Sequence, residues 1–477
     1  MKKLIYIIVN IVFSMLCMEC SFVDIDTPGL LNNEQLFQNR QGFVDAMAGV
    51  YASMAAPSLY GKELSYSFID EIAQLYENEE QANETFLTRT YDLQYTHPLV
   101  RNRINAIWSQ AYFCISSLNS VLEQSEHRKI KGLEAMRAEA YGLRAMLHLD
   151  LLRLFAPTIM QADSRAIPYV KTFSSAPQPV VSVKEGYELV TKDLLIADSI
   201  YTSLESKDAG KMVLAHRNPS FLYLSHNAVK ALLARAYLWQ NKLQEASLWA
   251  KKVIKEGYEL AKEEQLLDLF RGYNAKTECI FALHAPQMYI DVRNTCFPPR
   301  ATERFNKVRD NYRKIFSSHT FTATNNDYRF QSYFTLTNWG KSVVVLSKLY
   351  DKDYDEQQTP LQGRFPSINI IRLPEMYYIL AEASYDVDKQ ESVKMLNKVL
   401  VSRGLKPIEV SDVSNKQLFT QLLVNEITKE YWGEGQVFFT YKRFNLPLQG
   451  LHGKVHSANN STFILPIPVS ENLTYNP

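Results

Sequence analysis

The spacing of hydrophobic residues predicts long helices in the first half of the chain. Between Glu134 and Phe155 there is one glycine and no proline, and apolar residues recur every three or four positions, as on one face of a helix. A second apolar stripe, which includes Leu149 and Leu152, lies beside the first. Because so wide an apolar surface needs cover on more than one side, the pattern indicates a helix within a layered helical array.

Several segments read as pairs of helices joined by a short polar break. In segment 228–257, alanines keep the first helix narrow, residues 240–242 form the break, and the second helix ends at Gly257. Small residues let two antiparallel helices approach closely, and the pair resembles a tetratricopeptide unit. Segment 374–404 has the same pattern, and two further candidate pairs join 42–54 with 104–124 and 134–155 with 185–204. We therefore predict a mainly α fold with about four tetratricopeptide-like helical pairs.

A second part of the chain lacks a sustained helical period. Segments 58–100, 283–366 and 444–477 are rich in Tyr, Phe, Asn, Thr and Pro, which predicts long loops with short strands. Loops of this length in a compact protein are usually functional. We expect ligand-binding insertions near 58–100 and 283–366, within a single body that spans 41–477.

The N-terminus reads as an export signal. Lys2 and Lys3 precede an apolar run at 4–16, which is too short to span a bilayer. Cys17 and Cys20 follow, and either could be the acylated residue of a lipoprotein signal. We favour Cys20, because an extended polar segment suited to a tether follows it. This predicts a signal peptide at 1–19 and a lipid-anchored tether at 20–40.

The remaining cysteines do not form a recognisable framework. Cys114, Cys279 and Cys296 are few and odd in number, which argues against a disulfide-stabilised fold and leaves one bridge between two of them open. None of them has the spacing of metal ligands, so no metal and no cofactor is expected.

Composition narrows the classes of partner. The 477 residues carry 52 Lys and Arg against 51 Asp and Glu, so no strong field attracts phosphate backbones, and nucleic acid is not an expected partner. Aromatic residues make up 12% of the chain, and tyrosine suits half-exposed recognition surfaces as well as helix packing.

Short motifs occur in a characteristic order along nearly the whole chain. They are Cys20 with segment 21–28, the first-helix residues Phe37, Gly49 and Tyr51, Glu139-Ala140 with Leu143-Arg144-Ala145, the run ALLARAYL at 231–238, Glu278 with Ile280-Phe281, Arg372-Leu373 with Glu375 and Tyr377, Ala381-Glu382-Ala383, Glu434-Gly435 with Arg443, and Leu465-Pro466-Ile467-Pro468. In this order the chain resembles the SusD/RagB family of outer-membrane nutrient-binding lipoproteins of Bacteroidetes. Two residues depart from the commoner form of the Glu-Gly motif, Val437 and Thr440, which puts a polar network at that helix end in doubt.

The resemblance implies a mechanism of capture. Such proteins sit as lids on TonB-dependent (SusC-like) barrels, bind oligosaccharides or peptides outside the cell, and do no covalent chemistry. By this resemblance we expect a lipid-anchored, outward-facing outer-membrane protein that delivers a glycan or peptide to its barrel.

Six aromatic residues in the irregular segments are candidate ligand contacts. Trp339 is preferred, because polar neighbours surround its large ring. For each ring, the alternative is that it covers the core under a long loop. The other five candidates are Tyr60, Tyr66, Tyr76, Tyr289 and Tyr333.

Two other functions remain open from the sequence. A periplasmic tetratricopeptide-like scaffold would bind soluble proteins through its helices. A glycoside hydrolase would need two carboxylates, and Asp70 and Glu71 with Glu77, Glu79 and Glu80 are the candidates, although an acidic solvated helix or a Ca²⁺-binding loop explains them more simply. No nucleophile elbow, phosphate-binding loop or zinc-protease motif supports an enzyme.

Overall fold

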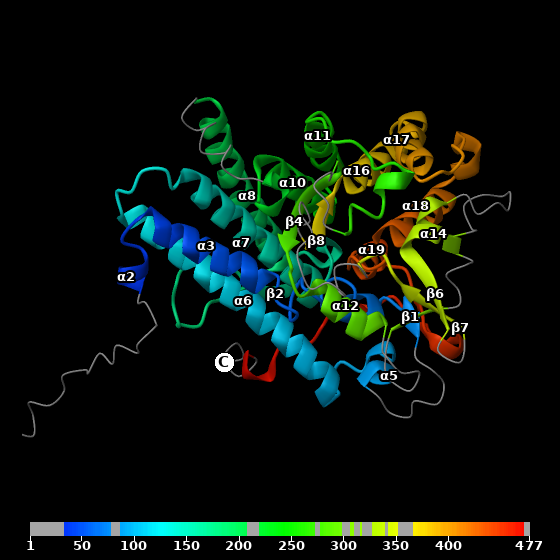
Figure 1. Cartoon of the computed structure of the whole chain (residues 1–477), viewed down its shortest axis with the longest axis horizontal. Helices are drawn as coiled ribbons and strands as arrows, with labels where there is room; N and C mark the ends of the chain where they lie inside the picture. Colours follow the sequence, from blue (N-terminus) through cyan, green and yellow to red (C-terminus); the bar gives the residue numbers. More distant parts are fainter. Residues whose placement is uncertain are drawn as a thin grey trace, which may run out of the picture.

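The structure is a computed structural model that describes residues 33–77, 86–207, 219–271, 277–297, 306–309, 315–316, 327–338, 342–351 and 366–471. Helices dominate it, as the sequence predicts (Figure 1). The helices are α2 (Asn33–Leu36), α3 (Arg40–Met54), α4 (Phe68–Ile72), α5 (Phe86–Tyr91), α6 (Pro98–His127), α7 (Glu134–Phe155), α8 (Val183–Glu205), α10 (His226–Trp239), α11 (Leu243–Ile254), α12 (Met288–Cys296), α14 (Tyr328–Tyr333), α16 (Leu373–Tyr385), α17 (Lys389–Ser402), α18 (Lys416–Tyr431), α19 (Val437–Phe444) and α20 (Asn460–Phe463).

The strands are short and form antiparallel pairs. Within the described ranges each sheet has two strands: β1 (Tyr76–Glu77) with β5 (Lys307–Val308), β2 (Arg165–Pro168) with β3 (Val180–Ser182), β4 (Cys279–His284) with β8 (Ser367–Arg372), β6 (Phe334–Asn338) with β7 (Ser342–Leu346), and β9 (Leu448–Gln449) with β10 (Val455–His456). Several of these strands lie in the segments for which loops with short strands are predicted.

The four predicted helical pairs are confirmed. Helix α3 packs against α6, α7 against α8, α10 against α11, and α16 against α17. Helix α11 also contacts α16, so the last two pairs stack on each other. Figure 1 shows α3, α6, α7 and α8 running alongside one another, with α10, α11, α16 and α17 beyond them. The result is the layered helical array that the periodicity predicts.

Helix α7 lies at the centre of this array. Nearly all of its side chains are buried, which is why its sequence is apolar on several sides. Gly142 of α7 faces Leu224 and Val229 so closely that a Cβ atom at this position would collide with the Leu224 side chain. Glycine at this position therefore allows α10 and the segment before it to pack directly on α7.

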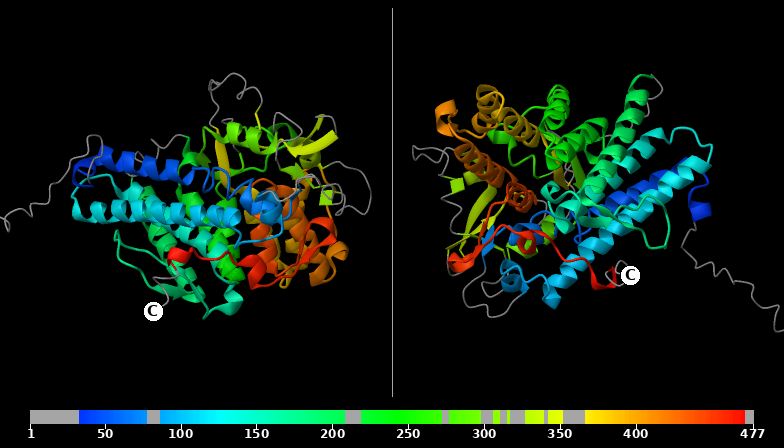
Figure 2. Two further views of the ribbon diagram at one scale, coloured as in Figure 1. Left: turned by 90° about the horizontal axis from the view of Figure 1, so that it is seen from below. Right: turned by 180° about the vertical axis from the view of Figure 1, so that it is seen from behind.

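The irregular segments pack around the other end of the molecule. Figure 2 shows α18, α19 and the strands near them as a second group beside the helical pairs, with α12 crossing the face between them. One continuous hydrophobic core joins the two groups. Phe37, within the range predicted as tether, is buried and packs on Phe43 with 4.7 Å between ring centroids, so the packed body includes residues before 41.

Other predictions for the N-terminus lie outside the described residues, among them the signal peptide and both candidate lipidation cysteines. Among the residues that are described, no helix combines the length and apolar character that a membrane span requires.

Candidate functional site

Five of the six aromatic candidates lie in the core. Tyr60 is 4% exposed, and its hydroxyl donates to Asp150 Oδ2 at 2.7 Å. A ring covered on both faces offers no surface to a sugar, so core packing, the alternative stated for each ring, accounts for these positions in the structure. The sixth candidate, Trp339, lies outside the described residues. The other four tyrosines, all 0% exposed, are Tyr66, Tyr76, Tyr289 and Tyr333.

Residues distant in sequence bury these tyrosines. Tyr76 meets Trp432 edge-on, with ring centroids 6.5 Å apart, and Tyr333 meets Phe270 edge-on, with ring centroids 5.6 Å apart. Neither partner is near its tyrosine in the sequence. The local composition of the irregular segments, which made these tyrosines candidates, therefore carries no information about their burial.

An open groove lies elsewhere, where the two predicted insertions begin. It has a volume of about 680 Å³, which is within the usual range for small-ligand sites. We call it the α3 groove. It is lined by α3 and the turn that follows, by Pro219, Leu222 and Tyr223 near the 3₁₀ turn Ser220–Leu222, and by residues from His284 to Asp291.

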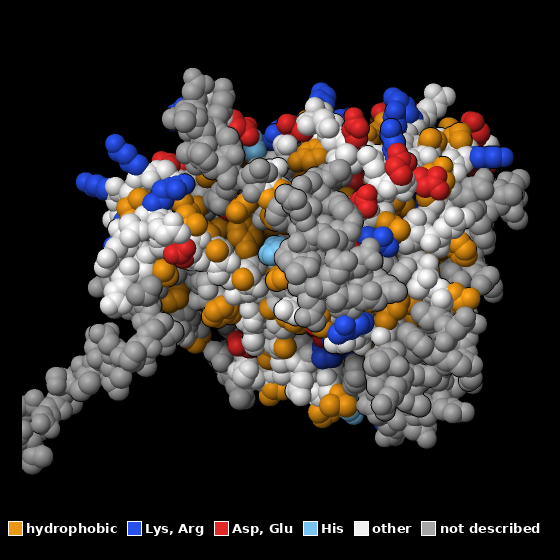
Figure 3. Space-filling model, viewed as in Figure 1, with side chains coloured by type: hydrophobic (Ala, Val, Ile, Leu, Met, Phe, Trp, Pro, Cys, Tyr) orange, Lys and Arg blue, Asp and Glu red, His pale blue; other side chains and the backbone are white. Residues whose placement is uncertain are grey.

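Small residues open the α3 wall of this groove. Ala48, Ala52, Ala55 and Ala56 follow helical spacing, so they line one side of α3 and its C-terminal turn with methyl groups only. Gly61 then passes so close to the Ala55 carbonyl oxygen that a Cβ atom would collide with the backbone there. The small alanine side chains of α3 and the close approach of Gly61 to Ala55 together create the space of the groove. Figure 3 shows hydrophobic side chains gathered on this face, over α3 and toward β4.

The aromatic floor of the α3 groove is fixed in position. The Tyr51 hydroxyl donates to Glu139 Oε2 of α7 and accepts from the backbone N–H of Leu224, each at 2.9 Å. Burial and the negative charge of Glu139 raise the pKa of Tyr51 well above its ordinary value, so the hydroxyl stays protonated. The Tyr223 ring packs edge-on against Tyr51, with centroids 5.9 Å apart. Rings held this way need little ordering when a ligand binds.

Polar groups line the far end of the groove. His284 and Gln287 are exposed, and Asp291 is half-buried on the first turns of α12. Although part of its side chain is exposed, desolvation of the ring by its neighbours lowers the pKa of His284 below its ordinary value, so this imidazole is largely neutral at pH 7. Burial raises the pKa of the Asp291 carboxyl, and the positive charge of Lys62 partly opposes the effect. The groove thus combines an aromatic floor with groups that can hydrogen-bond to hydroxyls.

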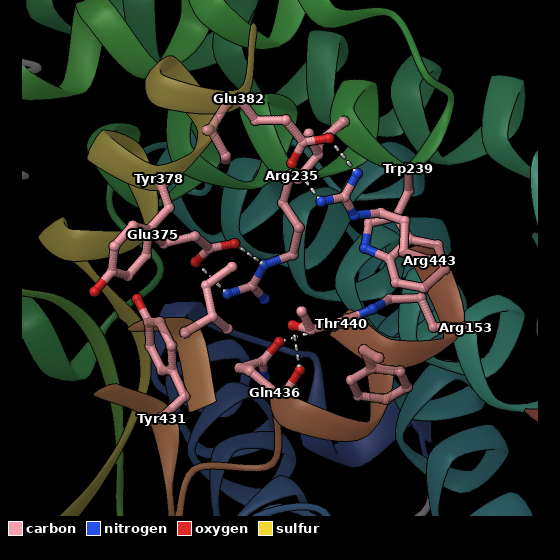
Figure 4. Close-up of a pocket in the computed structure, with 14 residues that line it drawn as sticks. Arg153, Arg235, Trp239, Glu375, Tyr378, Glu382, Tyr431, Gln436, Thr440 and Arg443 are labelled. Carbon is pink, nitrogen blue, oxygen red and sulfur yellow. Dashed lines mark hydrogen bonds and ion pairs between the residues drawn. The ribbon is translucent and has the colours of Figure 1, made fainter. Parts of the chain in front are cut away.

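A second cavity, shown in Figure 4, is already filled by ion pairs. Arg235 pairs with Glu375 through two hydrogen bonds of 2.6 and 2.7 Å, and Arg443 pairs with Glu382 at 2.7 Å. The remaining space is about 60 Å³, enough for a few water molecules. These side chains come from α10, α16 and the end of α19, so this cavity is an internal junction between helices.

The Glu-Gly motif belongs to a large buried ionic network. Glu434 accepts from Arg372 Nε at 2.7 Å, and Arg372 also bonds to Glu278 and Glu430, each at 2.7 Å. The departures at Val437 and Thr440 therefore do not remove a polar network from this part of the fold. Among the described residues, the ion pairs of this network join five cations and five carboxylates, namely Arg329, Lys348, Arg372, Arg403, Lys429, Asp327, Glu278, Glu426, Glu430 and Glu434.

Two of the carboxylates considered for hydrolysis have structural partners. Glu71 is buried and accepts from Arg103 at 2.6 Å and from Asn306 at 2.9 Å. Asp70 is buried and accepts from the Gly433 N–H at 2.7 Å. Both lie in α4, which is buried, so the solvated acidic helix proposed from the sequence is wrong for these two residues. Glu79 and Glu80 lie outside the described residues.

Cysteines and metal ligands give no further site in the described ranges. Cys114, Cys279 and Cys296 are buried and are not joined to one another, so the single bridge left open from the sequence does not form. No group of three or more His, Cys, Asp or Glu residues could hold a metal ion in this part of the chain.

Comparison with known proteins identifies the family. A model described as "SusD family" matches residues 335–466, and one described as "Starch-binding associating with outer membrane" matches residues 24–238. SusD-like protein P2 of Formosa agariphila is 22% identical over 99% of this chain and 97% of that protein. The chain belongs to the SusD/RagB family. SusD-family proteins are non-catalytic binding proteins, which excludes the hydrolase alternative.

Solved structures of SusD-family proteins share the fold. A SusD superfamily protein from Bacteroides thetaiotaomicron has a TM-score of 0.72 at 21% identity, covering 92% of this chain and 98% of that one. A SusD-like carbohydrate binding protein from Bacteroides vulgatus has a TM-score of 0.71 at 18% identity, covering 92% and 96%. The predicted SusD-like fold is therefore confirmed.

Reasoning from the sequence does not predict most residues of the α3 groove. Tyr51 belongs to a family pattern but carries no mark of a ligand site in the sequence, and neither Tyr223 nor Asp291 lies in a distinctive motif. The alanine spacing on α3 was the available signal, because methyl groups on an exposed helical face leave room for a ligand.

Proposed function

We propose that this SusD-family protein captures carbohydrate in the α3 groove at the surface of the outer membrane and delivers it to a TonB-dependent barrel. Three observations support the proposal. One matching family model is described as starch-binding and associated with the outer membrane, a structural neighbour is described as carbohydrate binding, and the α3 groove offers an aromatic floor beside a polar end. The groove is the observation that carries it.

The chemistry of the groove suits a sugar. The apolar face of a pyranose can pack on the rings of Tyr51 and Tyr223, and its hydroxyls can bond to His284, Gln287 and Asp291. Each ring contributes on the order of 1 kcal/mol, so binding depends on several contacts and is individually weak. Weak binding permits release of the glycan into the barrel.

Attachment through a lipid on Cys20 completes the proposal. Several acyl chains, at about 0.8 kcal/mol per buried CH₂, would hold the protein stably at the membrane. The periplasmic scaffold alternative predicts different partners. A capture protein should co-purify with an outer-membrane barrel, whereas a scaffold should co-purify with soluble periplasmic proteins.

Filling the groove tests where the ligand binds. Ala52 is exposed on α3 and lines the groove, so Ala52→Trp should occupy the space without disturbing the core. We expect at least a tenfold loss of affinity for whichever neutral oligosaccharide or peptide binds the wild type in a calorimetric screen.

The matched control places the same side chain outside the groove. Gln244 is exposed on α11, and Gln244→Trp should leave the affinity unchanged. If Ala52→Trp binds as tightly as the control, the ligand site lies elsewhere, with Trp339 the next candidate. If only peptides bind in the screen, the ligand of the protein is a peptide and the proposal of carbohydrate capture is wrong.

A further inference from the structure

The α3 groove has an uneven distribution of charge. Asp291 is the one residue with a full charge among the described residues that line it, since the others are apolar, aromatic, amide or histidine side chains. His284 does not balance it, because partial desolvation lowers the pKa of this imidazole and leaves it largely neutral at pH 7. A ligand in the groove therefore meets one negative charge and no fixed positive charge from these residues.

The Asp291 carboxylate is available to a ligand. It makes no hydrogen bond or ion pair with any described residue, in contrast to the buried carboxylates of the ionic network. Lys62 acts on it only through its field, and burial of the carboxyl outweighs that field. The carboxylate oxygens can thus accept hydrogen bonds from sugar hydroxyls and are not neutralised by a partner.

We propose that Asp291 is a specificity-determining residue of the α3 groove, selecting neutral glycans and rejecting glycans that carry carboxylates. This inference rests on the proposed function, because it assumes that a glycan occupies the groove. A neutral sugar gains hydrogen bonds at Asp291. A uronate placed there would bring a second negative charge within a few ångströms in a partly desolvated site, where like charges repel.

The test compares one oligosaccharide in two charge states. The probe is the neutral oligosaccharide that binds best, measured before and after its primary hydroxyls are oxidised to carboxylates, so that the length and linkage stay the same. In the wild type at low salt, oxidation should weaken binding about tenfold or more. In Asp291→Asn the same oxidation should weaken binding at least threefold less, because the amide accepts hydroxyls without repelling the carboxylate.

Two controls separate the local charge from other effects. Asp163→Asn removes one exposed carboxylate outside the groove and should keep the wild-type ratio of the two dissociation constants. Raising the salt concentration should reduce the wild-type ratio, since a partly exposed charge pair is screened.

The outcomes distinguish the two proposals. If no oligosaccharide binds either protein, the proposed function fails. If neutral oligosaccharides bind, but the ratio is close to one in the wild type or is the same in Asp291→Asn and Asp163→Asn, the selectivity of Asp291 is overturned and carbohydrate binding stands.

Discussion

Single buried polar residues show how remote contacts set local chemistry. Asp70 is 0% exposed, and while its Oδ2 accepts from Gly433, its Oδ1 has no hydrogen-bond partner among the described residues. Burial raises the pKa of this carboxyl well above its ordinary value, against the field of Lys348. The sequence around Asp70 does not predict its burial or its raised pKa, because Gly433 lies far along the chain. The neighbouring acidic residues predict a solvated helix, but the fold buries Asp70 and Glu71.

The stability of Asp70→Asn relative to the wild type should increase as pH rises. A carboxyl whose folded pKa is raised contributes most below its unfolded pKa, near 4, and that contribution is lost as pH rises toward the folded pKa. The amide keeps the acceptor for Gly433 and does not ionise. In urea unfolding from pH 5 to pH 8, the free energy of unfolding of the mutant minus that of the wild type should therefore increase by up to about 1.4 kcal/mol per pH unit.

The control for this experiment is Asp163→Asn, which alters an exposed carboxyl. Its difference from the wild type should stay small at every pH. A constant difference between Asp70→Asn and the wild type across this range would contradict the raised pKa of Asp70.

Helices and their pairing are the part of this fold that the sequence predicts best. Periodicity along 228–257 and 374–404 locates both helices of each pair, because a buried face must repeat with the helical turn. The tyrosines of the irregular segments could not be assigned in the same way. Tyr76 is covered by Trp432, and a pairing across that sequence separation leaves no local period. The α3 groove escaped prediction for the same reason, since its walls come from three distant segments.

Overpacking the contact between paired helices should be costly. Ala246 of α11 is 0% exposed in the helical-pair region, so Ala246→Leu must push neighbouring helices apart. We expect a loss of about 1–3 kcal/mol in the free energy of unfolding, measured with urea. Gln244→Leu, at an exposed position on the same helix, should change it by less than about 0.5 kcal/mol. Equal effects of the two substitutions would mean that Ala246 does not limit the approach of the helices.

At the scale of the whole molecule, the ionic network joins elements that are far apart in sequence. Arg372 comes from β8, Glu278 lies just before β4, and Glu430 and Glu434 lie at the end of α18 and beyond it. Desolvation of these charges is offset only because each has partners, and the neighbouring arginines hold the pKa of Glu430 well below its ordinary value.

Arg372→Met should destabilise the whole fold. It leaves three buried carboxylates short of a partner, which typically costs about 3–5 kcal/mol. The matched comparison is Lys394→Met, which breaks an exposed pair with Glu391 and should cost less than about 1 kcal/mol. Thermal and urea unfolding would measure both, and similar losses would show that the network contributes no more than a surface pair.

The buried thiols have a practical consequence for following this protein in a membrane. Burial raises the pKa of Cys114 and Cys296 to about 12, so these sulfurs stay protonated and unreactive toward maleimides at neutral pH. Cys279 is buried as well. A single cysteine introduced at an exposed site, such as Gln244 on α11, would then be the reactive thiol of the described body. A fluorophore attached there could report opening and closing over a barrel without first removing Cys114, Cys279 or Cys296.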